Sequence, residues 1–216
     1  MQHLNHDQLI NMPGRYRAQL VNSLSGFKSA NLIGTSNEHN QTNLAMFSSV
    51  VHLGASPALV GFITRPNSVE RHTLDNIIQT KKFTINQVNE SFWQAAHQTS
   101  ARYSNDECEF EKTGLSPYYI DSFSAPFVKE SRLKYGLILR DIIPITLNGT
   151  QMVIGEITDI IANEAAIKAD GYIDIESLDT VAISGLDCYH TSRRLSRLSY
   201  AKPNSTPSKI PLDGEA

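Results

Sequence analysis

Short apolar or alternating segments recur along the chain, and turn residues separate them. Runs of this length, bounded by Gly, Pro, Asn or Asp, are typical of β-strands. We predict strands over residues 30–35, 44–51, 58–64, 83–88, 137–147, 152–161 and 181–184. Between the fifth and sixth of these, the pair Asn148-Gly149 favours a two-residue type I′ turn, because both central residues of that turn need positive φ. An antiparallel hairpin is therefore expected there.

Helical periodicity is confined to residues 71–79 and residues 90–101, where apolar side chains recur on one face. Many short strands, few helices and no regular strand-helix-strand alternation predict a mainly β fold, an antiparallel barrel with peripheral helices. Three prolines within residues 202–216 cannot continue a helix or a central strand. We expect one domain over residues 1–201, followed by a tail that is extended, disordered or laid on a partner subunit.

The polarity of the chain is mostly neutral. Its 216 residues include 51 Ser, Thr and Asn against 41 charged residues, and the net charge is −3. Without a long Lys/Arg block, we expect no binding to nucleic acid or to an anionic membrane. The polar start and the lack of a spanning apolar stretch predict a cytoplasmic protein, in which Cys108 and Cys188 are free thiols.

Common catalytic and binding motifs are missing from the sequence. It has no glycine-rich dinucleotide loop, no phosphate loop, no Gly-x-Ser-x-Gly elbow and no His-Glu-x-x-His helix. The seven histidines include no helical pair suited to a metal, so no metal site is expected and no catalytic side chain can be assigned. Enzyme chemistry in this chain would therefore come from a cofactor.

Three stretches carry candidate binding residues. Residues 42–51 contain the adjacent hydroxyls of Ser48 and Ser49 inside a predicted strand, where neighbours face opposite sides. One hydroxyl could face a bound anion, or both serines could simply satisfy local backbone groups. In residues 96–103, His97 shares a helical face with Trp93, and a lone helical histidine is more often structural than functional.

The remaining stretch, residues 65–77, brings basic side chains to the predicted start of a helix. Arg65, Arg71 and Thr73 could bind a phosphate there, because the first N–H groups and the helix dipole favour an anion. Glu70 and Asp75 could instead pair with the arginines on the surface.

In their order along the chain, several motifs resemble the flavin reductase-like family of FMN-binding split-barrel proteins. They include Asn43-Leu-Ala-Met-Phe-Ser-Ser, Arg71-His-Thr-Leu-Asp-Asn-Ile and Phe83-Thr-Ile-Asn, and the resemblance covers roughly residues 15–201. It implies an antiparallel six-stranded split β-barrel and a homodimer with FMN near the subunit interface. It also implies hydride transfer from NADH or NADPH to the flavin.

The resemblance further implies which residues contact FMN. Asn43, Leu44 and Ala45 would lie along the isoalloxazine edge, largely through backbone groups, and Ser48 and Ser49 would approach the phosphate. The other implied contacts are Arg71, Thr73, His97, Ala101 and Tyr103. His72 departs from the pattern, because many relatives carry Asp at this position.

Three functions are compatible with these features. The first is an NAD(P)H-dependent flavin reductase, which could supply reduced flavin to a partner monooxygenase. The alternative is an FMN-binding electron carrier or flavin store without nicotinamide activity. A third is a split-barrel oxidase acting on a pyridoxamine-type phosphate. With no dinucleotide motif, the sequence leaves the choice between NADH and NADPH open.

Overall fold

The computed structural model describes residues 1–66, 72–104 and 107–214. Within this part of the chain, none of the helices is long and apolar enough to cross a membrane. The helices are α1 (His6–Ile10), α2 (Gly14–Ser23), α3 (His72–Thr80), α4 (Trp93–Gln98), α5 (Glu109–Thr113) and the 3-10 helix η1 (Glu164–Ala166). The strands are β1 (Lys28–Ser29), β2 (Asn31–Ser36), β3 (Thr42–Phe47), β4 (Val51–Ala55), β5 (Ala58–Thr64), β6 (Lys82–Gln87), β7 (Pro117–Ile120), β8 (Phe123–Val128), β9 (Leu133–Ile145), β10 (Thr150–Ala162), β11 (Val181–Ser184), β12 (Cys188–Thr191), β13 (Arg197–Leu198) and β14 (Lys209–Ile210).

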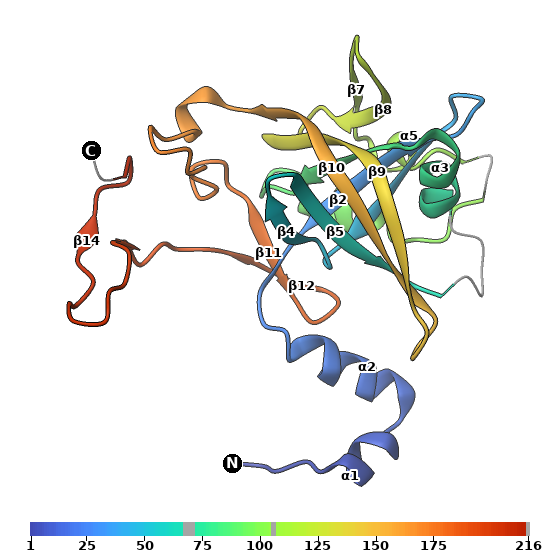
Figure 1. Ribbon diagram of the computed structural model, residues 1–216. Helices are drawn as coiled ribbons and strands as arrows, with labels where there is room; N and C mark the ends of the chain where they lie inside the picture. Colours follow the sequence, from blue (N-terminus) through green and yellow to red (C-terminus); the bar gives the residue numbers. More distant parts are fainter. Residues whose placement is uncertain (67–71, 105–106, 215–216) are drawn as a thin grey trace.

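Seven strands form the main sheet, in the order β3-β2-β6-β9-β10-β5-β4, and every pair is antiparallel. The long strands β9 and β10 run across the centre of the molecule in Figure 1 and join its two halves. Two register shifts in their pairing increase the local twist and help the sheet to curl. The mainly β fold and split barrel are confirmed, with seven strands in this sheet rather than the expected six.

Apolar side chains are buried on both faces of the sheet. Leu32 and Ile33 are neighbours on β2 and point to opposite sides, yet both are completely buried. Ile33 packs inside the barrel with Phe62 and Phe83, whereas Leu32 packs beneath α4 and α5 with Phe110. This two-sided burial explains why every residue of β2 is buried, although Asn31, Thr35 and Ser36 are polar.

Several predicted elements are confirmed with small changes of boundary. β5 and β11 have the predicted limits, and α3 occupies the first predicted helix. The second helix is shorter than predicted, because residues 99–101 continue in tight turns after Gln98. The single strand predicted over residues 44–51 is wrong: β3 ends at Phe47, and the chain bends before β4 begins at Val51.

The β9–β10 hairpin is confirmed, but its predicted two-residue turn is wrong. Ile145 pairs with Thr150, so the loop has four residues, and Gly149 has φ +73° whereas Asn148 is not at positive φ. The Asn148 side chain instead accepts hydrogen bonds from the backbone N–H of Thr150 at 3.1 Å and from its hydroxyl at 2.7 Å. This local side-chain bonding stabilises a longer loop.

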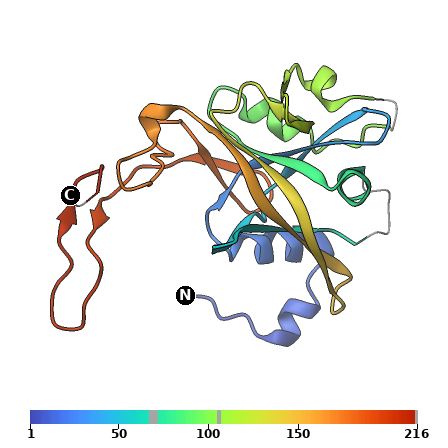
Figure 2. The same cartoon turned by 45° about the horizontal axis from the view of Figure 1, so that its top comes forward.

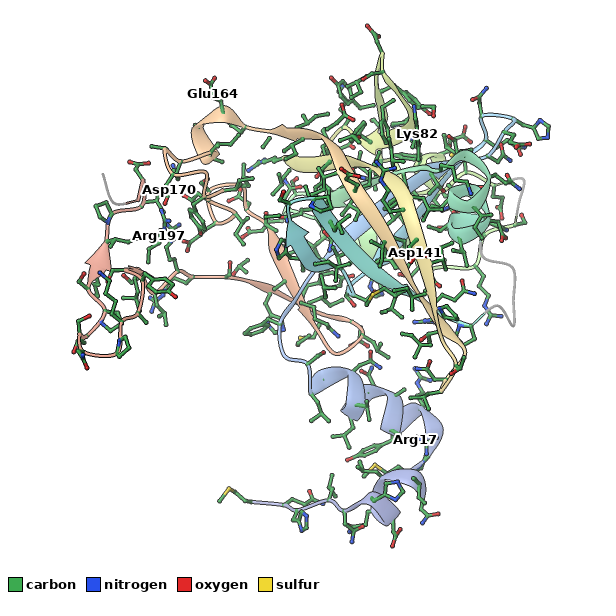
Figure 3. The ribbon with its side chains drawn as sticks, in the orientation of Figure 1. Arg17, Lys82, Asp141, Glu164, Asp170 and Arg197 are labelled. Atoms are coloured by element: carbon green, nitrogen blue, oxygen red, sulfur yellow. The ribbon has the colours of Figure 1, made fainter. Side chains whose placement is uncertain are left out.

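Both ends of the chain extend away from the barrel, as Figure 2 shows. Helices α1 and α2 contain no buried residue. At the other end, β13 and β14 form a hairpin, and the domain limit expected after residue 201 falls between these two strands. Arg197 anchors the hairpin by an ion pair with Asp170, and both residues are labelled in Figure 3. Its guanidinium also lies over the ring of Tyr172, 4.5 Å from the centroid.

Gly34 on β2 provides a test of the packing between the main sheet and β8. An added Cβ would lie 2.2 Å from the carbonyl oxygen of Pro126 and 2.7 Å from the hydroxyl of Thr84. We expect Gly34→Ala to lower the free energy of unfolding by about 1–3 kcal/mol or more, because this backbone contact cannot relax locally. Urea denaturation would measure the loss. Gly14→Ala is the control, because nothing lies within 4 Å of its Cβ, and an equal effect of both substitutions would contradict the interpretation.

Candidate functional site

A cavity of about 880 Å³ lies beside the edge strand β3, between the start of α3 and the loop that follows α4. Its walls combine apolar side chains, such as Met46 and Leu186, with hydroxyl, amide and guanidinium groups. The predicted site residues that line it are Asn43, Ala45, Ser48, Ser49, Thr73, Ala101 and Tyr103. Three separate segments of the chain thus bring predicted residues to one cavity of a size typical for cofactor sites.

Three predicted contacts lie elsewhere or outside the description. The side chain of Leu44 is completely buried in the cluster beneath α4 and α5. His97 is exposed, and its Nδ1 lies 3.0 Å from the hydroxyl of Tyr189, so in this structure it has a structural partner. Burial raises the pKa of Tyr189 to about 12, so its hydroxyl stays protonated at neutral pH. Arg71 lies outside the described residues.

Strand β3 presents one backbone edge to this region. It pairs with β2 on its other side, and the N–H of Leu44 points away from β2 to the carboxylate of Glu109, 3.1 Å from Oε2. Backbone N–H groups alternate in direction along a strand, so the N–H of Met46 lies on the same edge as that of Leu44. The edge therefore offers backbone donors to a bound molecule.

Neutral side chains connect three elements at the inner wall. The amide of Asn43 donates to the hydroxyl of Thr73 at 2.9 Å and lies 3.4 Å from that of Thr35. Asn76 donates to the same Thr35 hydroxyl at 3.1 Å. These buried bonds hold the first turn of α3 against β2 and β3, and so they hold the wall of the cavity in place.

Ser48 and Ser49 have different surroundings, although both line the cavity. The hydroxyl of Ser49 donates to the carbonyl of Ile63 at 3.2 Å and accepts from the N–H of the same residue at 3.0 Å. It thus bridges to β5 at the point where the chain bends between β3 and β4. The Ser49 hydroxyl stabilises the barrel, which agrees with the structural alternative considered for this residue.

Charged groups of both signs meet at the cavity. Arg65 and Arg102 contribute exposed guanidinium groups, and His72 contributes an imidazole. Glu109 is only 8% exposed, and its burial raises the pKa of its carboxyl, although the bond from Leu44 N–H and the charge of His72 act in the opposite direction. Two arginines and one buried acid thus give this cavity an uneven distribution of charge.

Arg102 and Glu109 line the cavity, but no sequence motif singles them out as site residues. Arg102 directly precedes a predicted residue, Tyr103, and its position in that loop was the available signal. Glu109 lies in an acidic run that is typical of a solvated surface. Only the packing of Phe110 beneath β2 turns the neighbouring carboxylate inward.

Comparison with known proteins matches residues 24–176 to the model of the flavin reductase like domain. A crystal structure from Shewanella frigidimarina, described as a candidate flavin reductase with a split barrel domain, is 54% identical, with a TM-score of 0.90. The match covers 93% of this chain and 100% of that one. Component B of nitrilotriacetate monooxygenase from Bacillus cereus has a TM-score of 0.80 at 21% identity, covering 92% and 98% of the two chains.

Two further relatives match a smaller share of the chain. Flavoredoxin of Desulfovibrio vulgaris is 23% identical, with a TM-score of 0.67 and coverage of 83% of this chain and 92% of that one. An uncharacterized protein of Aquifex aeolicus is 26% identical over 115 residues. That alignment spans 52% of this chain and 59% of the length of the relative.

The two serines at the bend can be separated by mutation. We expect Ser49→Ala to lower the free energy of unfolding by about 1–2 kcal/mol without any flavin present, because the N–H and carbonyl of Ile63 lose their partner. Ser48→Ala is the matched control and should change it by less than about 0.5 kcal/mol. Thermal and urea denaturation would measure both, and equal stability of the two variants would contradict a bridging role.

Proposed function

Because the chain belongs to the flavin reductase-like domain family, we propose that it binds FMN in the cavity beside β3 and reduces it with NADH or NADPH. The observation that carries the proposal is the combination, in one cavity, of the unpaired backbone edge of β3 with arginines and hydroxyls. An isoalloxazine ring needs the former, and a phosphate needs the latter.

The cavity suits FMN in size and chemistry. Its volume of about 880 Å³ falls within the usual range for cofactor sites, and Met46 and Leu186 provide apolar surface for a flat ring. Arg65 and Arg102 could bind the phosphate, which carries about two negative charges near neutral pH. Arg71 would add a third arginine, and its contribution stays a prediction.

Bound FMN would supply the chemistry of hydride acceptance from a nicotinamide. The protein would orient the ring along the β3 edge, where backbone N–H groups such as that of Met46 stabilise charge that develops on reduction. The hydrogen bond between Asn43 and Thr73 would keep this wall fixed while the nicotinamide binds next to the flavin. None of these roles needs a nucleophilic side chain or a metal.

An electron carrier is the second candidate function. The fold is shared with a flavoredoxin as well as with a monooxygenase component, and the same ring and phosphate contacts would serve either. A carrier would hold its flavin and exchange electrons with another protein, whereas a reductase could pass reduced flavin to a partner monooxygenase. Turnover with nicotinamides separates the two.

We also propose a homodimer. All of strand β4 lies at the edge of the sheet, and its Val51 and Leu53 are exposed. The helices α1 and α2 bury no residue on their own chain, and Leu195 and Leu198 of the C-terminal hairpin are also exposed. A second copy would cover this apolar surface.

The free thiols Cys108 and Cys188 suit a reducing compartment, the cytoplasm.

The proposed activity predicts a yellow protein that oxidises NADH or NADPH when FMN is supplied. We expect Arg102→Ala to weaken FMN binding about tenfold or more, because a charge-assisted bond to the phosphate is lost. Visible absorption, FMN titration and the rate of nicotinamide oxidation would measure these effects. Arg140→Ala is the control, because Arg140 pairs with Glu156 and does not line the cavity. Bound flavin without nicotinamide turnover would favour the carrier, and no flavin binding would reject both.

For the assembly, light scattering of the purified protein should give twice the chain mass of 24.0 kDa. Leu53→Arg should shift the protein toward the monomer at equal concentration, because a charge would be buried in the interface. A wild-type protein with the mass of one chain would contradict the dimer.

A further inference from the structure

Glu109 is held in one position at the boundary of two cavities. It lines the cavity of about 880 Å³ and an adjoining polar cavity of about 170 Å³. On one side its carboxylate accepts the Leu44 N–H, and on the other its backbone continues into Phe110, which is almost completely buried. The hydroxyl of Thr113 also donates to the Glu109 carbonyl at 2.7 Å. The bond from Leu44 thus holds the carboxylate at the cavity wall, and the other two contacts fix the backbone that carries it.

Among the residues that the structure describes, the groups around Glu109 offer little positive charge for this carboxylate. Lys112 on the same helix pairs with Glu107 at 2.8 Å. In the smaller cavity, Asp75 and Glu107 add acidic groups, and His72 from α3 is the basic group that faces Glu109. Ionised Glu109 therefore places a negative charge against the cavity wall.

The larger cavity does not neutralise the negative charge of Glu109. Its arginines, Arg65 and Arg102, are exposed and therefore screened by solvent, whereas Glu109 is buried where screening is weaker. Burial also raises the pKa of the Glu109 carboxyl, so this carboxyl takes up a proton at a higher pH than a surface glutamate does. A ligand in the cavity would experience the carboxylate more strongly than its exposure suggests.

We propose that Glu109 is a positioning residue that weakens the binding of reduced flavin relative to oxidised flavin, through its charge beside the β3 edge. This inference rests on the proposed function. A nicotinamide transfers two electrons and one proton as hydride, which leaves oxidised nicotinamide and a flavin with one additional negative charge on its ring. A carboxylate at the wall repels that charge, whereas a neutral carboxyl or amide does not.

The consequence is a site that favours onward transfer. Reduced flavin would leave, or pass its electrons to an acceptor, more readily than it would from a site of purely neutral donors. The hydrogen bond to Leu44 gives Glu109 a second role, because it holds the strand edge that meets the ring. The two roles can be separated, since an amide oxygen can accept the same bond without carrying the charge.

Glu109→Gln tests the charge while keeping the bond. We expect the dissociation constant of oxidised FMN to change less than about twofold and that of reduced FMN to fall roughly three- to tenfold at pH 8, where the wild-type carboxyl is ionised. The difference should shrink as the pH is lowered through the raised pKa of the Glu109 carboxyl, because the wild-type side chain then takes up a proton. Anaerobic titration with oxidised and dithionite-reduced FMN, together with dye-coupled measurement of the flavin potential, would give these ratios.

Glu111→Gln is the matched control, since Glu111 lies on the same helix, is exposed and does not line either cavity. Equal ratios of the two dissociation constants in wild type and Glu109→Gln would overturn the inference while leaving FMN binding intact. Failure of the wild-type protein to bind FMN would reject the proposed function itself. Should Glu109→Gln not fold, the wild-type ratio of reduced to oxidised dissociation constants is measured across pH, and a ratio that does not fall as the pH is lowered overturns the inference.

Discussion

The pairing of β9 with β10 is the constraint on which the rest of the structure depends. Each strand has thirteen residues, and together they connect β6 on one side with β5 on the other. Without this ladder the strands β3, β2 and β6 would be separated from β5 and β4. The register shifts within the ladder allow one sheet to curl around the apolar cluster that includes Phe62 and Phe83.

Curling leaves the sheet with two edges that have different surroundings. The edge strand β4 is exposed at four of its five residues. The other edge strand, β3, is partly covered by α5, and the rest of its edge borders the cavity. An uncovered strand edge is a row of unpaired backbone groups, which must find partners. At β3, Glu109 satisfies one N–H, and the remaining edge is available to a ligand. The candidate site thus lies where the sheet leaves the backbone edge of β3 without a neighbouring strand.

Much of this fold could be predicted from local patterns. The strands β5 and β11 and helix α3 follow from apolar periodicity, because each is bounded by residues that end its element. The bend at residues 48–50 could not be predicted in this way, since apolar residues resume at Val50 and Val51 directly after the two serines. What ends β3 there is the bridge from Ser49 to Ile63, a contact between residues distant in sequence.

The site was predictable only in part, for the same physical reason. Motif order identified Asn43 and Thr73, and they do meet, although their positions differ by 30 residues. It did not identify Glu109, whose inward direction depends on the burial of its neighbour Phe110. A short acidic segment carries no periodic signal of its own, so its side-chain directions are set by tertiary packing alone.

Several of the abundant neutral polar residues form hydrogen bonds inside the protein. The amide of Asn43 donates to Thr73 and to Thr35, and the amide of Asn76 donates to Thr35. Ser49 bonds to backbone groups of β5. Donors committed to such buried networks are costly to divert to a ligand, because their partners would be left unsatisfied. Recognition must therefore rely on the groups that the network leaves available, which are the backbone edge of β3 and the exposed arginines. The neutral side chains build the wall, and the backbone and the charges determine what binds against it.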